Sequence, residues 1–296
     1  MKPQEILIYT NTSGGSITFG VGSIYHVNVS KDVTGLSDLA DTIYSTSSNG
    51  QDGDTYVGVR IEPRDIVIKG KIRDDTKANQ LTYRRNAVKI LNPKIAGTLT
   101  YQIGTYVRRI GAIVDGAPKF THSGQLQEFE VDLKCLSPFW EEERDRKEDI
   151  ATWIGDWEFP CEILRDDEQS MIFGHHEESV IVDVFNSGDI TTGMRVVFRA
   201  LGALSNPLLF NVNTREFLKV NIDLAAGDVL TIDTNYGRKT VTLVHNGVTT
   251  NVYRYIDVDS TFMQLDVGDN LFRYDASSGF DNLECTIYFS QKYLGV

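Results

Sequence analysis

Two histidines followed by two glutamates, His175 to Glu178, are the strongest metal-ligand candidates by residue type. Imidazole and carboxylate groups bind zinc, and catalytic zinc sites present them from one face of an element, as in HExxH. Adjacent residues point in different directions on a strand or a helix, and no HExxH spacing is present. The pattern favours an exposed polar loop, so neither a metal nor another cofactor is predicted.

Paired carboxylates occur twice near the C-terminus, as Asp257 with Asp259 and as Asp266 with Asp269. Glycoside hydrolysis uses two carboxyl groups held about 5–10 Å apart, with the pKa of the acid raised. Acidic residues are, however, ordinary components of the turns that flank strands. No GxSxG, P-loop or GxGxxG pattern accompanies them. We therefore predict no catalytic residues and no enzymatic activity.

Five aromatic residues in the C-terminal part could form a platform on which sugar rings stack: Tyr253, Tyr255, Phe262, Phe272 and Tyr274. On a strand, the period of two would place Tyr253 and Tyr255 on one face. Aromatic residues of an all-β domain lie more often in the core. If that face is the inner one, glycan binding there is excluded.

The three cysteines, Cys135, Cys161 and Cys285, are odd in number and lack a CxxC spacing. Zinc ribbons and disulfide frameworks need closer or paired cysteines. Free cysteine behaves mostly as a small buried apolar residue. We therefore expect reduced cysteines with a structural role.

The net charge of −12 is unevenly distributed. Residues 1–140 hold 16 basic and 14 acidic residues, residues 141–178 hold 4 and 14, and residues 179–296 hold 9 and 13. Nucleic-acid-binding proteins carry a concentrated basic face, and no segment here is strongly basic. Specific nucleic-acid binding is not expected.

No apolar run approaches the ~20 residues of a membrane helix, and no cleaved secretory signal is predicted.

The length of 296 residues suggests two domains. Residues 1–140 have the pattern of a β-rich domain with one helix, because short strand-like runs surround a single helical segment. Ala78, Leu81, Val88 and Leu91 recur there at helical spacing, Asp74 or Asp75 can cap the start, and Pro93 ends it. A polar stretch from Ser45 to Asp54 is predicted to be a loop.

Residues 141–178 form an acidic connector, and residues 179–296 have the pattern of a β-sandwich. The second prediction rests on short strands separated by turns such as Asn246-Gly247. The predicted fold class is therefore mainly β, with an N-terminal β-rich domain and a C-terminal sandwich.

A collinear series of short motifs resembles the distal tail proteins of siphophages of Gram-positive hosts. The N-terminal motifs are Gly53, Arg60, Pro63-Arg64, the single helix after the strand Ile66–Ile72, and Ser137-Pro138-Phe139-Trp140. The C-terminal motifs are Asn186–Asp189, Gly202, Asn206-Pro207, Asn211–Thr214, Gly227-Asp228, Ile232–Thr234, Ser260–Phe262, Leu265 and Gly268–Asn270. Each motif is weak alone, but their order across both halves is specific.

This resemblance implies a hexameric ring at the tail tip, in a virion component assembled in the bacterial cytoplasm. It implies that the N-terminal domain joins the tail tube protein to the tail-tip protein. The C-terminal domain would resemble galectin-like or carbohydrate-binding sandwiches and face receptor-binding proteins. The alternative is a carbohydrate-binding module that recognises host cell-surface glycan.

Residues of the predicted subunit interface come from the polar loop and the helix. The loop contributes Asp52, Gly53 and Asp54, and the helix contributes Arg84 and Arg85. Long loops inside compact domains are often functional. The alternative for the two arginines is a solvated helix face.

Overall fold

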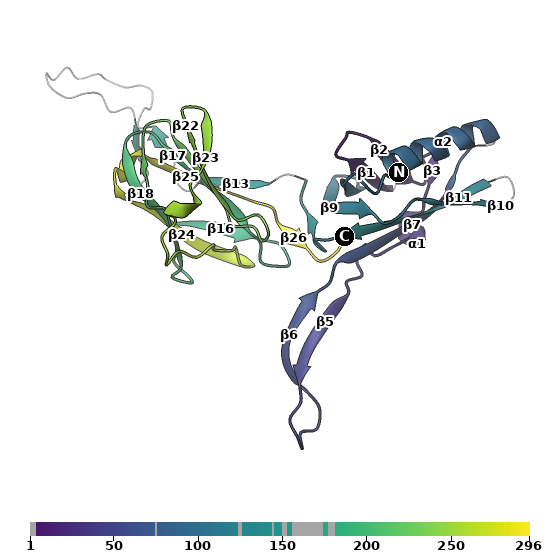
Figure 1. Cartoon of the computed structure of the whole chain (residues 1–296), viewed down its shortest axis with the longest axis horizontal. Helices are drawn as coiled ribbons and strands as arrows, with labels where there is room; N and C mark the ends of the chain where they lie inside the picture. The colour runs from purple at the N-terminus through teal and green to yellow at the C-terminus, as the bar shows by residue number, and fades with distance from the viewer. Residues whose placement is uncertain are drawn as a thin grey trace. The chain divides into compact units, whose positions relative to one another are not determined.

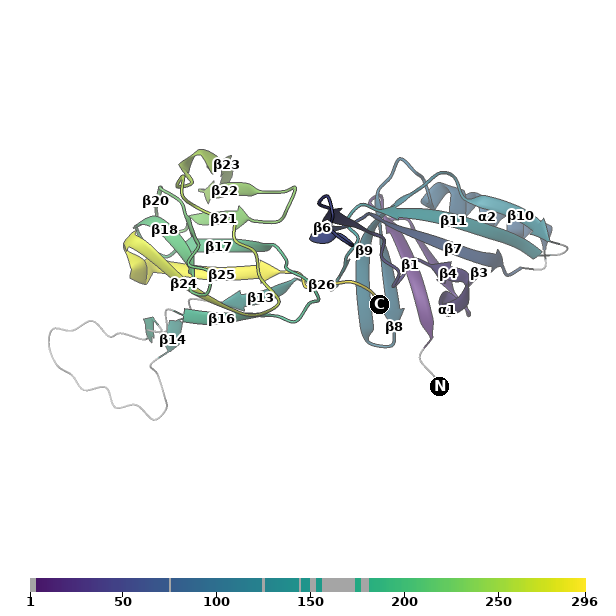
Figure 2. The ribbon, with the colours of Figure 1, turned by 90° about the horizontal axis from the view of Figure 1, so that it is seen from below.

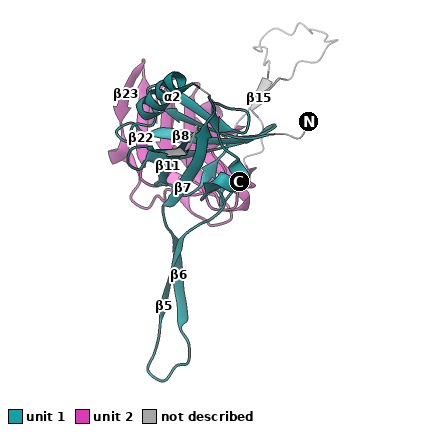
Figure 3. Ribbon diagram, turned by 90° about the vertical axis from the view of Figure 1, so that its right-hand side faces the viewer, with its two compact units in different colours: residues 1–143, 292–296 teal, residues 144–291 magenta. Residues whose placement is uncertain are grey.

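The computed structural model describes residues 4–74, 76–123, 126–143, 145–149, 153–155, 174–176 and 181–296. The chain divides into two compact units, and Figure 3 colours them separately. Unit 1 comprises Met1–Glu143 and Lys292–Val296, and unit 2 comprises Arg144–Gln291. Each unit has its own buried core.

Unit 1 is mostly β-structure. Its described strands are β1 (Glu5–Asn11), β2 (Ser16–Gly20), β3 (Tyr25–His26), β4 (Val33–Thr34), β5 (Asp41–Thr46), β6 (Thr55–Ile61), β7 (Arg64–Ile72), β8 (Gly97–Ile103), β9 (Tyr106–Val114), β10 (Lys119–Ser123), β11 (Leu126–Cys135), β12 (Trp140–Glu141) and β26 (Lys292–Tyr293). Its helices are α1 (Val29–Asp32) and α2 (Lys77–Ile90).

Most of these strands form one sheet that closes on itself. The order is β10-β11-β7-β3-β2-β1-β8-β9-β12-β26, and β9 also pairs with β11. Alternate residues point inward, as Leu7 and Tyr9 of β1 and Ile66 and Ile68 of β7 do, and all four are fully buried. The result is a barrel-like domain that confirms the predicted β-rich fold (Figure 1), and the short helix α1 is present in addition to the one predicted helix.

Helix α2 lies where the sequence predicts it but buries a different face. Its buried residues are Gln80, Ala87 and Ile90. Of the predicted apolar stripe, Leu91 is buried, but the prediction is wrong at Leu81 and Val88, which are 60% and 45% exposed. Leu81 and Val88 are seven residues apart and lie on one face of the helix. Their spacing does not show whether that face is buried or exposed.

The start of the helix also differs slightly from the prediction. Thr76 is the N-cap residue. Asp74, one of the two predicted caps, accepts a hydrogen bond from the Thr76 backbone N–H at 2.8 Å and so shapes the turn before the helix. The predicted end is confirmed, since the helix ends at Ile90, ahead of Pro93.

Unit 2 consists of short strands and two 3₁₀ turns. Its described strands are β13 (Arg146–Asp149), β14 (Trp153–Gly155), β15 (Gly174–His176), β16 (Ile181–Asn186), β17 (Met194–Ala200), β18 (Leu204–Asn211), β19 (Phe217–Lys219), β20 (Asp223–Leu224), β21 (Val229–Asp233), β22 (Thr240–His245), β23 (Val248–Asn251), β24 (Gly268–Ser278) and β25 (Leu283–Phe289). The turns are η1 (Tyr253–Tyr255) and η2 (Phe280–Asn282).

Two antiparallel sheets make unit 2 a β-sandwich, as predicted (Figure 2). One has the order β13-β25-β17-β21-β22-β23 and the other has the order β16-β24-β18-β19. Phe198 of β17 and Ile287 of β25 share a single core with Phe272 and Tyr274 of β24. Inward residues of both sheets therefore form the hydrophobic centre of the sandwich.

The chain returns to unit 1 at its C-terminal end. Strand β26 pairs with β12, so that Trp140 lies opposite Tyr293 and Glu141 opposite Lys292. From the predicted connector, the strand β13 adds to the sheet of unit 2 beside β25. The acidic patch Asp166–Glu168 and Cys161 lie outside the described residues. Neither α-helix of the described ranges has the length and apolar composition to cross a bilayer.

The thiols of Cys135 and Cys285 are free and buried, as expected of structural cysteines. Burial raises the pKa of the Cys135 thiol to about 12 and also raises that of Cys285. In a Cys161→Ser variant, we expect neither thiol to react with a disulfide reagent at pH 8, because the thiolate is the reacting species. Unfolding in guanidinium should then release two thiols per chain, and rapid labelling of the folded variant would contradict the burial.

Candidate functional site

A two-stranded hairpin projects from unit 1, and we call it the arm (residues 41–61). Strands β5 and β6 pair only with each other among the described strands, and the arm extends away from the barrel in Figures 1 and 3. Residues 41–57 are all exposed. An isolated two-stranded hairpin is at best marginally stable in water. The arm therefore contributes no buried residue to the core of unit 1.

The strand pairing of the arm gathers apolar residues on one face. Ile43 pairs with Val59 and Ser45 pairs with Tyr56, with a register shift between Tyr44 and Ser45. Paired residues share a face, and residues 43 and 45 are two apart on one strand. The bulge therefore places Tyr56 on the same face as Ile43 and Val59. These three side chains are 64%, 65% and 52% exposed.

The tip of the arm carries the predicted interface residues Asp52, Gly53 and Asp54, all exposed. Gly53 has a φ of +80°, a conformation that glycine adopts without strain. Asp54 accepts a hydrogen bond from the Ser45 hydroxyl at 2.9 Å, which ties the loop to β5. The predicted polar loop is thus the end of a hairpin whose strand β5 the sequence analysis did not identify.

A buried arginine holds the base of the arm. Arg64 is only 2% exposed, although Lys and Arg are almost never buried without a partner. Its Nε donates to the Pro138 carbonyl at 2.9 Å, and its Nη1 donates to the carbonyls of Gly35 and Leu36 at 2.8 Å. A second terminal nitrogen donates to the Leu294 carbonyl. We call this arrangement the Arg64 clamp.

The Arg64 clamp joins three segments that are far apart in the sequence. Gly35, with a φ of +87°, lies so close to β7 that an added Cβ would be 2.0 Å from the Asp65 carbonyl oxygen. Trp140 is fully buried and donates from its indole nitrogen to Leu36 at 3.0 Å. Burial lowers the pKa of the Arg64 guanidinium, which nonetheless stays protonated in a protein. The backbone carbonyls therefore supply the hydrogen-bond acceptors for its charge, and the nearby Asp38 favours the charged form.

Beside the clamp, Tyr293 fixes the returning strand β26. The Arg108 guanidinium lies 4.0 Å from the centre of the Tyr293 ring. The Tyr293 hydroxyl donates to Glu142 at 3.0 Å. The last residues of the chain are thus part of the structure that supports the arm.

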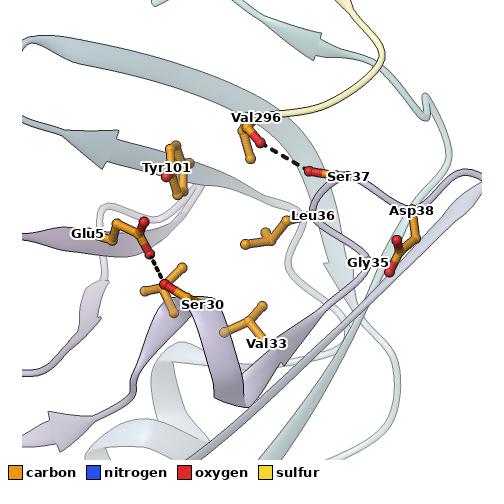
Figure 4. A pocket seen from close by; sticks show the side chains of 10 residues that line it. Glu5, Ser30, Val33, Gly35, Leu36, Ser37, Asp38, Tyr101 and Val296 are labelled. Carbon is orange, nitrogen blue, oxygen red and sulfur yellow. Dashed lines mark hydrogen bonds between the residues drawn. The ribbon is translucent and has the colours of Figure 1, made fainter.

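A cavity of about 270 Å³ opens next to this region. Figure 4 shows Ser30 donating to Glu5 and Ser37 donating to the Val296 carbonyl, at 2.7 and 3.0 Å. Ligand pockets usually measure about 300–1,000 Å³ and present convergent polar groups. Here both serine hydroxyls are already bonded within the protein, so the arrangement is that of a packing gap.

Arg84 and Arg85, the other predicted interface residues, lie on the exposed side of α2. The Arg84 guanidinium stacks over the Phe120 ring at 5.0 Å from its centre. The described structure does not bring either arginine to the arm of the same chain, and α2 and the arm lie at opposite ends of unit 1 in Figures 1 and 3. The two predicted halves of the interface are therefore separate surfaces.

Within the described part of the chain, Asp257 lacks the features of a general acid and the metal candidates are not gathered into a site. Asp257 accepts hydrogen bonds from the Asp259 backbone and from Asn221, which lower the pKa of its carboxyl, whereas a general acid needs a raised pKa. His175 and His176 lie on β15, and Glu177 and Glu178 lie outside the described residues. Among the described residues, no three potential ligands of the His, Cys, Asp and Glu types gather to hold a metal.

The aromatic platform is only partly present. Phe272 and Tyr274 are fully buried in the core of the sandwich, which excludes them from sugar stacking. Tyr253 and Tyr255 lie in the 3₁₀ turn η1 and not on a strand, so the predicted alternation is wrong there. Tyr253 is 47% exposed and stacks on Phe262 with 5.8 Å between ring centres.

Two family models match the chain. The model described as "Phage tail protein RIFT-related domain" matches residues 22–135, and the model described as "Siphovirus-type tail component, C-terminal domain" matches residues 187–293. Together they cover most of both units and define the chain as a phage tail component. It belongs to the siphophage distal tail protein family. Comparison with curated proteins gives no significant match.

Solved structures have the same fold over the whole chain. The Dit protein (gp 19.1) of phage SPP1, described as a paradigm of the hub adsorption apparatus in phages infecting Gram-positive bacteria, matches with a TM-score of 0.67 and 12% identity. That match covers 97% of this chain and 98% of the other. A chain of the phage P2 baseplate, in its activated conformation with Ca, matches with a TM-score of 0.56, 13% identity and complete coverage of both chains.

Proposed function

We propose that the protein is a non-enzymatic structural hub of the tail tip, which assembles as a hexameric ring. In this function unit 1 forms the ring and joins the tail tube protein to the tail-tip protein. Unit 2 faces outward, where receptor-binding proteins attach. Membership of the distal tail family and the fold shared with the SPP1 hub protein support this assignment.

The single observation that carries the self-assembly is the arm. It exposes Ile43, Tyr56 and Val59 on one face, and large exposed apolar patches mark interaction sites. The arm projects from one end of unit 1 (Figure 1), and a contact between the arm of one copy and a different surface of the next copy is a head-to-tail contact. Head-to-tail contacts of this kind close into rings when the rotation between copies permits.

The molar mass in solution tests the proposal. Light scattering during size-exclusion chromatography should give six chains of 33.2 kDa, about 199 kDa in all, and the value should hold on dilution. Incubation with the tail tube protein should add mass to this species without dissociating it. A chain that stays at 33.2 kDa at every concentration, with and without the tube protein, would contradict the ring.

A further inference from the structure

The search for a partner of the arm leads to helix α2, whose outer face is basic and partly apolar. The helix carries Lys77, Arg84, Arg85 and Lys89 and no acidic residue, a net charge of +4. Leu81 and Val88, two turns apart, are both exposed on it. Among the described residues, none of these four cations takes part in an ion pair.

The arm has the opposite charge and a matching apolar face. Residues 41–61 hold three acidic residues and one arginine, a net charge of −2. Asp52 and Asp54 lie at the tip, and the apolar face of Ile43, Tyr56 and Val59 lies on the strands. The acidic groups of the arm complement the basic side chains of the helix, and the apolar face of the arm complements the exposed apolar residues of the helix.

The lengths of the two elements also agree. Helix α2 has 14 residues, and at 1.5 Å per residue it spans about 21 Å. Strand β6 has seven residues, and at about 3.3 Å per residue it spans about 23 Å. The arm can therefore lie along the whole helix. Because the two elements are at opposite ends of unit 1, the helix that an arm reaches belongs to another copy (Figures 1 and 3).

We infer that the arm of each chain docks on helix α2 of the next chain in the ring. The apolar face of the arm covers Leu81 and Val88, and the acidic tip lies against the basic side of the helix. The inference rests on the proposed ring and assigns its interface. Every chain gives one arm and receives one, so no copy is left with a free surface when the ring closes.

Charge reversal on full-length chains tests this pairing. One variant, the arm reversal, carries Asp52→Lys and Asp54→Lys. The other, the helix reversal, carries Arg84→Glu and Arg85→Glu. All four positions are exposed, and circular dichroism and thermal melting check that each variant folds. Each variant alone should lose assembly at physiological salt, because the two charges at the arm tip then face two like charges at positions 84 and 85 of the helix.

Mixing the two variants is the decisive step. In an equimolar mixture, every arm can meet a helix of opposite charge on the other variant, so the assembled mass should return with the two chains in equal amounts. The chain that combines both reversals should also assemble by itself. A matched control, Asp259→Lys with Asp269→Lys, reverses two exposed carboxylates of unit 2 and should leave assembly unchanged.

Several outcomes would overturn the inference. If the wild-type chain assembles and both reversed variants assemble equally well, the arm-to-helix pairing is wrong while the ring stands. If both variants are single chains and the mixture stays dissociated, the pairing is wrong as well. A wild-type chain that never assembles, even with the tube protein present, overturns the ring itself and the pairing with it.

Discussion

Excision of the arm is expected to convert the assembly into single chains of about 31 kDa, since 277 residues remain of the 296 that give 33.2 kDa. The Glu62 backbone N–H donates to the Ala40 carbonyl at 2.9 Å, so the chain ends left by the excision are already adjacent. A two-residue Asn-Gly turn can join Ala40 to Glu62, because this turn suits a tight hairpin connection. Unit 1 should keep its core, since none of residues 41–61 is buried.

Light scattering measures the mass, and thermal melting shows whether unit 1 remains folded. A pair of single substitutions serves as a matched control for the arm's two faces. Tyr56→Ser removes an aromatic ring from the apolar face and should shift the equilibrium toward single chains, whereas Tyr44→Ser, on the opposite face with Gly58, should have little effect. An excised chain that still assembles with six copies would contradict a role for the arm in the ring.

Substitution of the clamp arginine, Arg64→Met, is expected to destabilise unit 1 by about 3–5 kcal/mol. Methionine matches much of the volume but donates no hydrogen bond, so the carbonyls of Gly35, Leu36, Pro138 and Leu294 lose their donors. A buried acceptor left unpaired costs its full desolvation. Arg64→Lys should recover part of the loss, because a single ammonium cannot reach carbonyls on several sides.

Hydrogen exchange of the β7 and β11 backbone amides reports this change for unit 1 specifically, since these strands pair along nine residues. Arg73→Met is the matched control: Arg73 is exposed and donates to the Val21 carbonyl at 3.1 Å. It should change the free energy of unfolding by no more than about 0.5 kcal/mol. Equal protection in the Arg64→Met and Arg73→Met chains would show that the clamp does not stabilise the fold.

Alternation of apolar and polar residues was sufficient to predict the fold class and many strands. In β11 and β25 every second residue is buried, so the sequence period of two corresponds directly to the structure. The orientation of α2 was not predictable, because its solvent side carries the exposed apolar residues Leu81 and Val88. Apolar residues at helical spacing give the same sequence pattern whether they face the solvent or the core.

The sequence analysis did not identify strand β5, because this strand also contributes nothing to a buried core. Thr42, Ile43 and Tyr44 are good strand formers, but the acidic and polar residues around them indicate a loop when no second sheet face is buried. The clamp depends on long-range geometry instead. Arg64 meets Pro138 and Leu294 across 74 and 230 residues of sequence. The motif Ser137–Trp140 was singled out by resemblance, and only the structure explains why it accompanies Arg64.

The return of strand β26 to unit 1 has a consequence for how the chain is made. Residues 144–291 are contiguous, so unit 2 can fold as soon as they have left the ribosome. Unit 1 must wait for Lys292–Val296, although almost all of it is synthesised first. At about 5–20 residues per second, translation of the intervening segment takes about 7–30 s. A nascent or prematurely terminated chain therefore lacks the Leu294 carbonyl that accepts a hydrogen bond from Arg64, and its arm base is unfinished.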